Sequence, residues 1–308
     1  GLISLIRSGE DVTNVCTSLI KNLSYLFIDL GEYTLSNFNQ NISSWDVSNV
    51  TNMEGAFFRA VDFNQDISNW DVSSVSNMKN MFRIARAFNA DISNWDVSGV
   101  TNMYGMFQDK GKDSPLTFDI TEWNVSNVTN MAWMFETSTF NQDISGWDIS
   151  NVTTMSNMFN NADEFSHDLS GWDLSNVKDM SGMFRNNSAS IFYLSDWDVS
   201  SVTNMSNMFE AITTPLESDI SSWDVSSVSN MNRMFFATDF NQNLSEWCVP
   251  NITSEPDRFG NTGANPVWGT CPGLPLTPTI ISPSDNSTDV SLNVEFEWET
   301  DDLTTHTQ

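Results

Sequence analysis

Apolar side chains recur along this chain in one phrase that is repeated from end to end. Residues 63–82 show the phrase clearly, as Phe-Asn-Gln-Asp-Ile-Ser-Asn-Trp-Asp-Val-Ser-Ser-Val-Ser-Asn-Met-Lys-Asn-Met-Phe. Its tryptophans lie 25, 25, 28, 24, 25, 25, 26 and 24 residues apart, at Trp45, Trp70, Trp95, Trp123, Trp147, Trp172, Trp197, Trp223 and Trp247. A phrase repeated at this period predicts a solenoid in which each repeat forms one coil.

Within a coil, the apolar positions predict two kinds of local structure. Ile67, Trp70 and Val72 have the spacing of the strand segment in leucine-rich repeats, and they alternate with polar residues. The residues that follow, Val75 to Phe82, are apolar at intervals of three and four, which favours a short helical turn. The expected fold class is therefore an α/β repeat solenoid, with leucine-rich-repeat-like coils of about 25 residues.

The two ends of the array depart from the phrase and are expected to cap it. Residues 1–36 are interpreted as an N-terminal cap with a degenerate first repeat, in which residues 2–6 form a short helix. Residues 37–247 are the regular repeats, and residues 248–274 form a C-terminal cap that covers the last apolar edge.

Beyond the cap, the pattern changes to that of a different domain. Residues 275–283 contain several prolines and are expected to be a stiff linker. Residues 290–298 alternate between apolar and polar side chains, as a half-buried strand does. Because one or two strands do not fold alone, residues 284–308 are interpreted as the truncated beginning of a fibronectin type III or immunoglobulin-like β-sandwich.

The positions of the three cysteines predict one disulfide and one free thiol. Cys248 and Cys271 flank the C-terminal cap, and we expect a disulfide between them that stabilises the cap by about 3 kcal/mol. The alternative is a pair of buried thiols. Cys16 is expected to be a free, buried cysteine inside the degenerate first repeat.

Composition excludes several functions. The chain has 308 residues with 12 Lys and Arg against 40 Asp and Glu, a net charge of −28, so nucleic acid is not an expected partner. No apolar run reaches the length of a membrane span. With His167 and His306 as the only histidines and a filled core in place of a cleft, we do not expect an enzyme or a Cys/His metal centre.

The repeated phrase resembles that of the BspA-like leucine-rich-repeat surface proteins, a bacterial family that includes secreted proteins of the Bacteroidota. The likeness covers residues 12–272 and includes the closing segments around Trp247 and residues 267–272. The resemblance implies an extracellular protein displayed on the cell surface, often an adhesin, with no enzyme activity and no defined ligand.

The outward position after the repeat tryptophans forms a column of aspartates, interrupted by Asn124, that suggests calcium. Hard cations prefer carboxylate oxygens, and such a column needs something to offset the repulsion between its members. The alternative is that each carboxylate accepts hydrogen bonds from nearby Ser hydroxyls or backbone amides at a turn. No cofactor is expected apart from this possible calcium. The candidate ligands are Asp46, Asp71, Asp96, Asp148, Asp173, Asp198 and Asp224.

Departures from the phrase mark candidate ligand-binding residues. One expected aromatic patch lies at the Gln position of the repeats and consists of Phe118, His167, Phe192 and Tyr193. The alternative is that these substitutions reflect local repacking of the core. A second pair, Tyr104 and Trp133, occupies the variable positions between two methionines, where rings can stack on sugars. The longer coil around Lys110 and Lys112 adds loop surface of the kind that repeat proteins use for binding.

Three functions remain open from the sequence. The first is an extracellular, cell-surface adhesin or interaction module whose partners are other surface proteins, matrix or glycans. The second is a rigid acidic spacer in a long surface protein or filament. The third is calcium-dependent carbohydrate binding. Aromatic departures favour the first because a spacer does not need them, whereas only the third uses the aspartate column directly.

Overall fold

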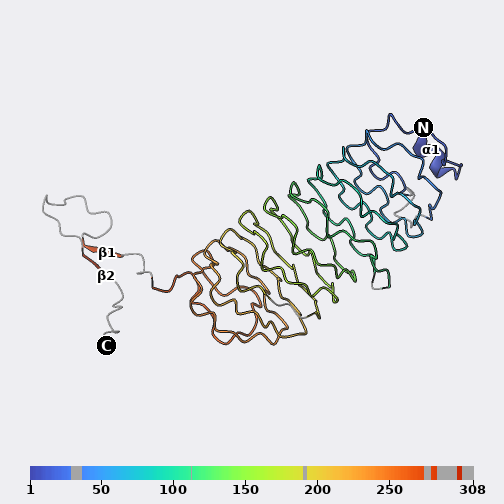
Figure 1. The fold of residues 1–308 in the computed structure, drawn as a ribbon. Helices are drawn as coiled ribbons and strands as arrows, with labels where there is room; N and C mark the ends of the chain where they lie inside the picture. Colours follow the sequence, from blue (N-terminus) through green and yellow to red (C-terminus); the bar gives the residue numbers. More distant parts are fainter. Residues whose placement is uncertain (29–36, 112, 190–192, 274–278, 283–296, 300–308) are drawn as a thin grey trace, which may run out of the picture.

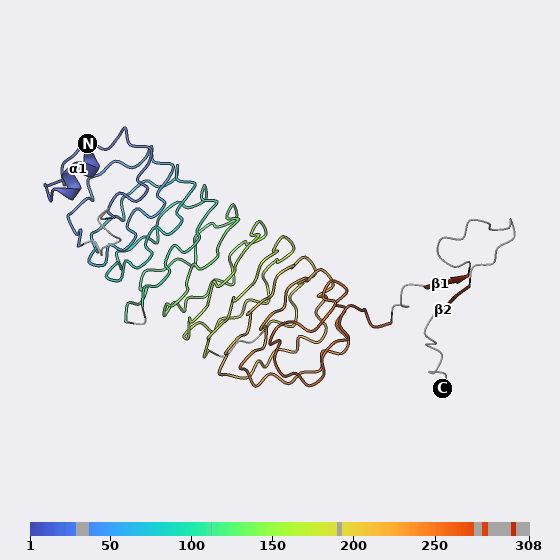
Figure 2. The same cartoon turned by 180° about the vertical axis from the view of Figure 1, so that it is seen from behind.

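The repeats form an elongated stack of coils, which the computed structural model describes for residues 1–28, 37–111, 113–189, 193–273, 279–282 and 297–299 (Figures 1 and 2). Successive coils pair in parallel at a single backbone position. These pairs run along one column, Asn22, Asn52, Asn77, Asn102, Asn130, Thr154, Asp179, Asn204 and Asn230. Each coil therefore contacts the coils before and after it, as in other repeat proteins.

Within the described residues, regular secondary structure is confined to the two ends of the chain. Helix α1 spans Leu2–Arg7, strand β1 spans Thr279–Ser282 and strand β2 spans Glu297–Glu299. The expected α/β class is wrong, because neither strands nor helices form in the described part of residues 37–247. Those coils are built from turns.

Tight turns on both sides of Trp70 explain why the expected strand does not form. The backbone N–H of Trp70 donates to the carbonyl of Ile67 at 3.1 Å, and that of Val75 donates to Val72 at 2.9 Å. A strand needs an extended chain over several residues, and here the chain reverses every few residues. Equivalent bonds recur in the other coils, at Trp95–Ile92 and Val100–Val97 for example.

Left-handed residues explain why the expected helical turn does not form either. Between the two methionines of a coil, the second residue has a positive φ, and the backbone N–H of Met81 closes the turn onto the Met78 carbonyl at 3.1 Å. The N–H of Asn80 donates to Tyr104 in the next coil at 2.7 Å, whereas an α-helix would need it within its own chain. The positive-φ column is Tyr25, Gly55, Asn80, Gly105, Trp133, Asn157, Gly182, Asn207, Arg233 and Arg258.

Glycine adopts the positive φ of this column without strain, which gives a first prediction. A Cβ at Gly182, whose φ is +61°, would lie 2.3 Å from Oδ1 of Asn157. We expect Gly182→Ala to lower the free energy of unfolding by about 1–2 kcal/mol through the backbone alone. Urea denaturation measures the change. Gly146→Ala is the control, since a Cβ there meets nothing within 4 Å, and it should cost less than about 0.5 kcal/mol. Equal losses would contradict the explanation.

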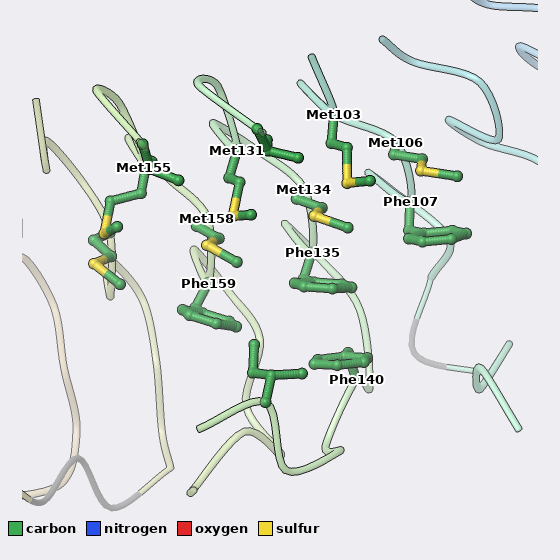
Figure 3. Packing of buried hydrophobic residues seen from close by; sticks show 14 of the residues in the cluster. Met103, Met106, Phe107, Met131, Met134, Phe135, Phe140, Met155, Met158 and Phe159 are labelled. Atoms are coloured by element: carbon green, nitrogen blue, oxygen red, sulfur yellow. The ribbon is translucent and has the colours of Figure 1, made fainter. Parts of the chain in front are cut away.

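Methionine and phenylalanine columns fill the core of the stack (Figure 3). Phe135 stacks on Phe159 at 5.9 Å between ring centroids, and Phe159 stacks on Phe184 at the same distance. Methionines such as Met131 and Met155 are fully buried above them. The predicted inward positions of the phrase are thus confirmed, although the backbone that carries them differs from the expected one.

The tryptophans form a second column with a polar role that the sequence did not reveal. Each indole is buried, and its Nε1–H donates to a backbone carbonyl of the preceding coil. Trp70 donates to Ile42 at 3.2 Å and Trp147 donates to Ile120 at 3.3 Å. The same bond is made by all nine members of this Trp column: Trp45, Trp70, Trp95, Trp123, Trp147, Trp172, Trp197, Trp223 and Trp247. The Trp column therefore links every coil to the one before it.

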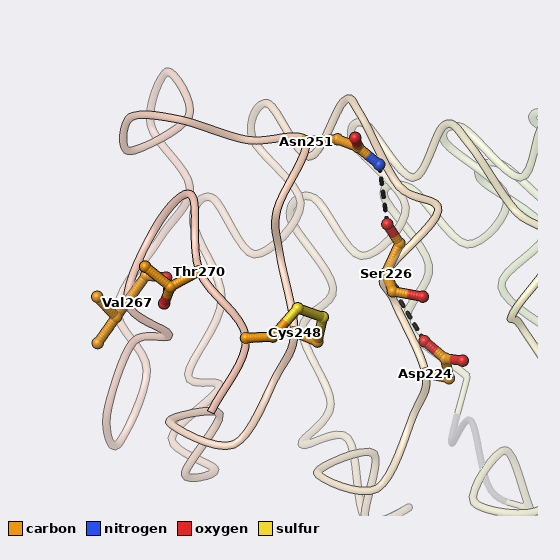
Figure 4. Close-up of a disulfide and its surroundings, with 7 residues drawn as sticks. Asp224, Ser226, Cys248, Asn251, Val267 and Thr270 are labelled. Atoms are coloured by element: carbon orange, nitrogen blue, oxygen red, sulfur yellow. Dashed lines mark hydrogen bonds between the residues drawn. A yellow bond between two sulfur atoms is a disulfide. The ribbon is translucent and has the colours of Figure 1, made fainter. Parts of the chain in front are cut away.

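Both ends of the stack carry caps. The predicted N-terminal helix is confirmed as α1, and Leu2 and Ile6 pack against the core. The predicted disulfide between Cys248 and Cys271 is also confirmed (Figure 4). Next to it, the N–H of Val249 donates to the carbonyl of Thr270 at 2.8 Å, which joins the last coil to the cap.

The expected β-sandwich is wrong for the described residues. Strands β1 and β2 form a single antiparallel pair with Thr279 opposite Glu299 and Ile280 opposite Trp298. One pair of strands is not two packed sheets. Strand β1 also falls within residues 275–283, where a linker was expected, and residues 283–296 and 300–308 lie outside the described part of the chain.

Candidate functional site

The aspartate column lies on the surface, and each carboxylate accepts hydrogen bonds from within its own turn. Oδ1 of Asp71 accepts hydrogen bonds from the N–H of Ser73 at 3.1 Å and from its hydroxyl at 2.6 Å. Each of the other six candidate ligands accepts from the N–H of the residue two positions later: Asp46, Asp96, Asp148, Asp173, Asp198 and Asp224. Hydrogen bonding therefore stabilises the carboxylates locally, which is the alternative to calcium.

The pKa shifts of these aspartates also reflect hydrogen bonds within the turns. Side-chain and backbone hydrogen bonds from Ser48 lower the pKa of Asp46, and those from Ser150 lower the pKa of Asp148. Among the described residues, no three His, Cys, Asp or Glu side chains come together as ligands for a metal ion. The geometry gives calcium no support at this column.

The expected aromatic patch at the Gln positions is not assembled. Phe118 is only 6% exposed and packs edge-on against Phe88 at 5.9 Å, so it belongs to the core. The ring of His167 is half-buried, within 3.1 Å of the Asn141 carbonyl and edge-on to Phe165. Tyr193 is 55% exposed, beside a shallow hollow formed with Glu217 and Asp219, while Phe192 lies outside the described residues.

Two other sequence expectations change with the structure. Lys110 is fully buried and donates to the carbonyls of Ala85, at 3.2 Å, and Phe88, so it fills the longer coil from inside and is not free to bind a partner. Burial lowers the pKa of Lys110 to about 8. The prediction of a buried Cys16 is wrong, because it occupies the outward position of the aspartate column and is exposed. Lys112 lies outside the described residues.

Tyr104 and Trp133 are both half-buried and lie on the face formed by the turns after each first methionine. We call this the turn face; it comprises residues 54–59, 79–84, 104–109, 132–137, 156–161, 181–186, 206–211 and 232–237. With the degenerate first repeat counted as coil one, Tyr104 lies in coil four and Trp133 in coil five. The N–H of Gly105 donates to the Ala132 carbonyl at 2.8 Å, which joins the two coils beside these residues. Both residues thus occupy neighbouring coils of one surface.

Further aromatic and basic side chains extend this surface toward the N-terminus. Tyr25, which is 38% exposed, meets Phe58 edge-on at 6.3 Å. The Arg83 guanidinium lies 5.5 Å from the Phe58 ring, and the Lys79 ammonium lies 5.6 Å from the Tyr104 ring. We name the set Tyr25, Phe58, Lys79, Arg83, Tyr104 and Trp133 the aromatic strip.

Glu54 holds the N-terminal half of the aromatic strip together. Its Oε1 accepts a hydrogen bond from the Tyr25 hydroxyl at 3.1 Å and pairs with Lys79 at 3.2 Å. Burial and the Glu54 carboxylate raise the pKa of Tyr25. Sequence analysis missed Tyr25 and Phe58, because Tyr25 belongs to the degenerate first repeat and Phe58 follows a core phenylalanine; comparing every coil at the turn positions reveals both.

The repeat architecture defines the class to which this protein belongs, a stack of turn-built coils with a continuous apolar core. Models of the family described as "Mycoplasma protein of unknown function, DUF285" match residues 4–117, 111–191 and 171–266, and the chain belongs to this family. The expected resemblance to BspA-like leucine-rich-repeat proteins is therefore wrong as a family assignment. No curated protein and no solved structure matches the chain. Within the described residues, no helix has the length and apolar character needed to cross a membrane.

Proposed function

We propose that this protein is an extracellular, surface-displayed interaction module that binds a partner through the exposed surface of its coil stack. The observation that carries the proposal is the aromatic strip, which gathers partly exposed Tyr, Phe and Trp side chains with Arg and Lys on one face. Aromatic residues and Arg are enriched at protein interfaces, and Tyr, Trp and Arg at the energetically important contacts within them. The same positions in coils six to eight hold Ser156, Asn157, Ser181, Gly182, Ser206 and Asn207, so the fold itself does not require rings there.

The disulfide supports the extracellular part of this proposal. Disulfides persist in oxidising environments and are rare where thiols are kept reduced. Cys248–Cys271 lies in the cap of the stack, where it constrains the end of the structure. A net charge of −28 is also typical of a protein that stays soluble at high local density.

A rigid acidic spacer is the second candidate, and the polar coils favour it. In coils six to eight, the turn face carries small polar residues, and the carboxylates of Asp148, Asp173 and Asp198 accept hydrogen bonds within their own turns. A spacer needs only that regular, soluble rod. The aromatic strip distinguishes the two functions, because a spacer has no use for it.

A binding screen of the 308-residue chain against matrix proteins, glycans and bacterial cells tests the proposal, with each assay run in calcium and in chelator. We expect saturable binding that survives chelation, since the aspartate carboxylates are hydrogen-bonded within their own turns. Binding that disappears in chelator would instead indicate a calcium-organised surface. Absence of binding in both buffers would contradict the interaction module and favour the spacer.

A further inference from the structure

We propose that the aromatic strip binds a neutral carbohydrate chain lying along the stack. This inference rests on the proposed interaction function and names the ligand class for it. Tyr25, Phe58, Tyr104 and Trp133 are distributed over the first five coils and are each partly exposed. A sugar offers an apolar C–H face to a ring and hydroxyl groups to polar neighbours, and a chain of sugars repeats both features along its length.

The separation of the rings favours a glycan over a folded protein partner. Tyr104 and Trp133 are separated in the turn face by Gly105, and Tyr25 is separated from Tyr104 by the Glu54–Lys79 ion pair. The centre of a protein interface is a compact apolar area with charged residues depleted. Here charged side chains lie beside three of the rings, Glu54 at Tyr25, Arg83 at Phe58 and Lys79 at Tyr104, which suits sugar rings that alternate apolar faces with hydroxyl edges.

Local charge favours a neutral glycan over an acidic one. The turn face of coils two to five carries Arg59, Lys79 and Arg83 together with Glu54, Asp109 and Glu136, so its charges balance within a chain of net charge −28. Lys79 is already paired with Glu54 at 3.2 Å. A polyanion would meet no local excess of positive charge and would be repelled by the remaining surface.

Gly105 places no side chain of its own between Tyr104 and Trp133, because the Asn80 carboxamide already occupies the space beside it. Gly105 has a φ of +58°, and Oδ1 of Asn80 lies 2.4 Å from where its Cβ would stand. Trp133 shares the positive-φ column with Gly105 and has a φ of 62°, a conformation that asparagine adopts more easily than tryptophan. A tryptophan at this position carries a backbone cost that asparagine would largely avoid, which supports a binding role for its ring.

The test is isothermal titration of the intact chain with hexasaccharides of glucose in α- and β-linkage, N-acetylglucosamine, and mannose, and with sulfated and uronic-acid oligosaccharides as anionic probes. We expect at least one neutral probe to bind with an affinity insensitive to salt. Tyr104→Ser together with Trp133→Asn, which introduces the residues found at Ser156 and Asn157, should weaken that binding at least about tenfold. Its melting temperature should not fall.

Tyr193→Ser is the matched control, because it removes an exposed ring away from the aromatic strip, and it should leave the affinity unchanged. Three results would overturn the proposal: no neutral probe binds, the double variant binds like the parent, or only anionic probes bind with salt-sensitive affinity. If glycans fail while a matrix protein or cell binds in the screen, the interaction function survives and the carbohydrate assignment does not. If nothing binds in either experiment, both fail.

Discussion

Trp147→Phe is expected to lower the free energy of unfolding by about 2–4 kcal/mol. Trp147 is 4% exposed, and its indole N–H donates to the Ile120 carbonyl of the preceding coil at 3.3 Å. Phenylalanine cannot donate this bond, so the Ile120 carbonyl keeps only the turn bond from the Trp123 N–H, and the lost hydrogen bond costs about 0.5–1.5 kcal/mol. The smaller ring also leaves unfilled volume in a core that packs closely.

The position of Trp147 in the stack adds a cooperative consequence. Each coil is stabilised by its neighbours alone, so weakening a central interface reduces the coupling between the two halves of the stack. We expect urea denaturation, followed by circular dichroism, to show an earlier and broader transition than the parent. A shallower slope would report partial uncoupling as well as lost stability.

Trp133→Phe is the control for this prediction, because it makes the same chemical change outside the Trp column. Trp133 is half-buried on the turn face, and its replacement should change the free energy of unfolding by less than about 0.5 kcal/mol. Similar losses for the two variants would show that the Trp column stabilises the stack through ring size alone and not through its hydrogen bonds.

Sequence periodicity located the buried columns but not the backbone that carries them. The residues of one phrase, Ile67, Trp70, Val72, Met78 and Phe82, are all buried, as their spacing predicts. The same spacing of three and four residues also fits successive tight turns, which is why a helical turn was expected in error. Hydrogen bonds between coils favour the tight turns over a helical turn, and a single sequence does not reveal those hydrogen bonds.

One signal of the turns was nevertheless present in the sequence. The position two residues after the first methionine holds Gly55, Asn80, Gly105, Asn157, Gly182 and Asn207, and these are the residue types that tolerate a positive φ. In the sequence analysis this position counts only as one of the variable positions between two methionines. Read as a requirement for left-handed backbone, the position excludes an α-helix and also identifies Trp133 as an unusual occupant.

Candidate site residues failed where a coil departs from the regular length or phrase. Lys110 occupies the position that Ala60, Ala85 and Ala162 hold in regular coils, which is buried there too, and Phe118 follows the longer loop at a position that Gln65 leaves half-buried. Cys16 was misplaced because the first repeat is degenerate, which obscured its alignment with the outward aspartates. Local insertions change which way a side chain faces, and a pattern derived from regular coils does not follow that change.

Removing the Cys248–Cys271 disulfide is expected to destabilise the C-terminal cap by about 3 kcal/mol while leaving the first coils unchanged. The bond joins residues 23 apart in sequence, so breaking it releases a loop whose closure restricts the unfolded chain. In the folded cap, Phe259 packs edge-on against Phe235 at 5.3 Å and against Trp268 at 5.0 Å. These contacts retain part of the cap after the disulfide is lost, so we expect fraying and not collapse.

Hydrogen exchange of the Cys248→Ala/Cys271→Ala variant measures this effect coil by coil. Amides that tie the cap to the stack, such as those of Leu244, bonded to Ala264 at 2.8 Å, and Val249, should exchange faster by up to about 100-fold. Amides of coils two to four should keep the parent rates, because each coil depends on its immediate neighbours. Both proteins should carry Cys16→Ser, which removes the exposed free thiol and prevents exchange with the disulfide. Unchanged protection in the cap would show that its packing alone closes the stack, and a uniform loss in all coils would show that the stack unfolds as one unit.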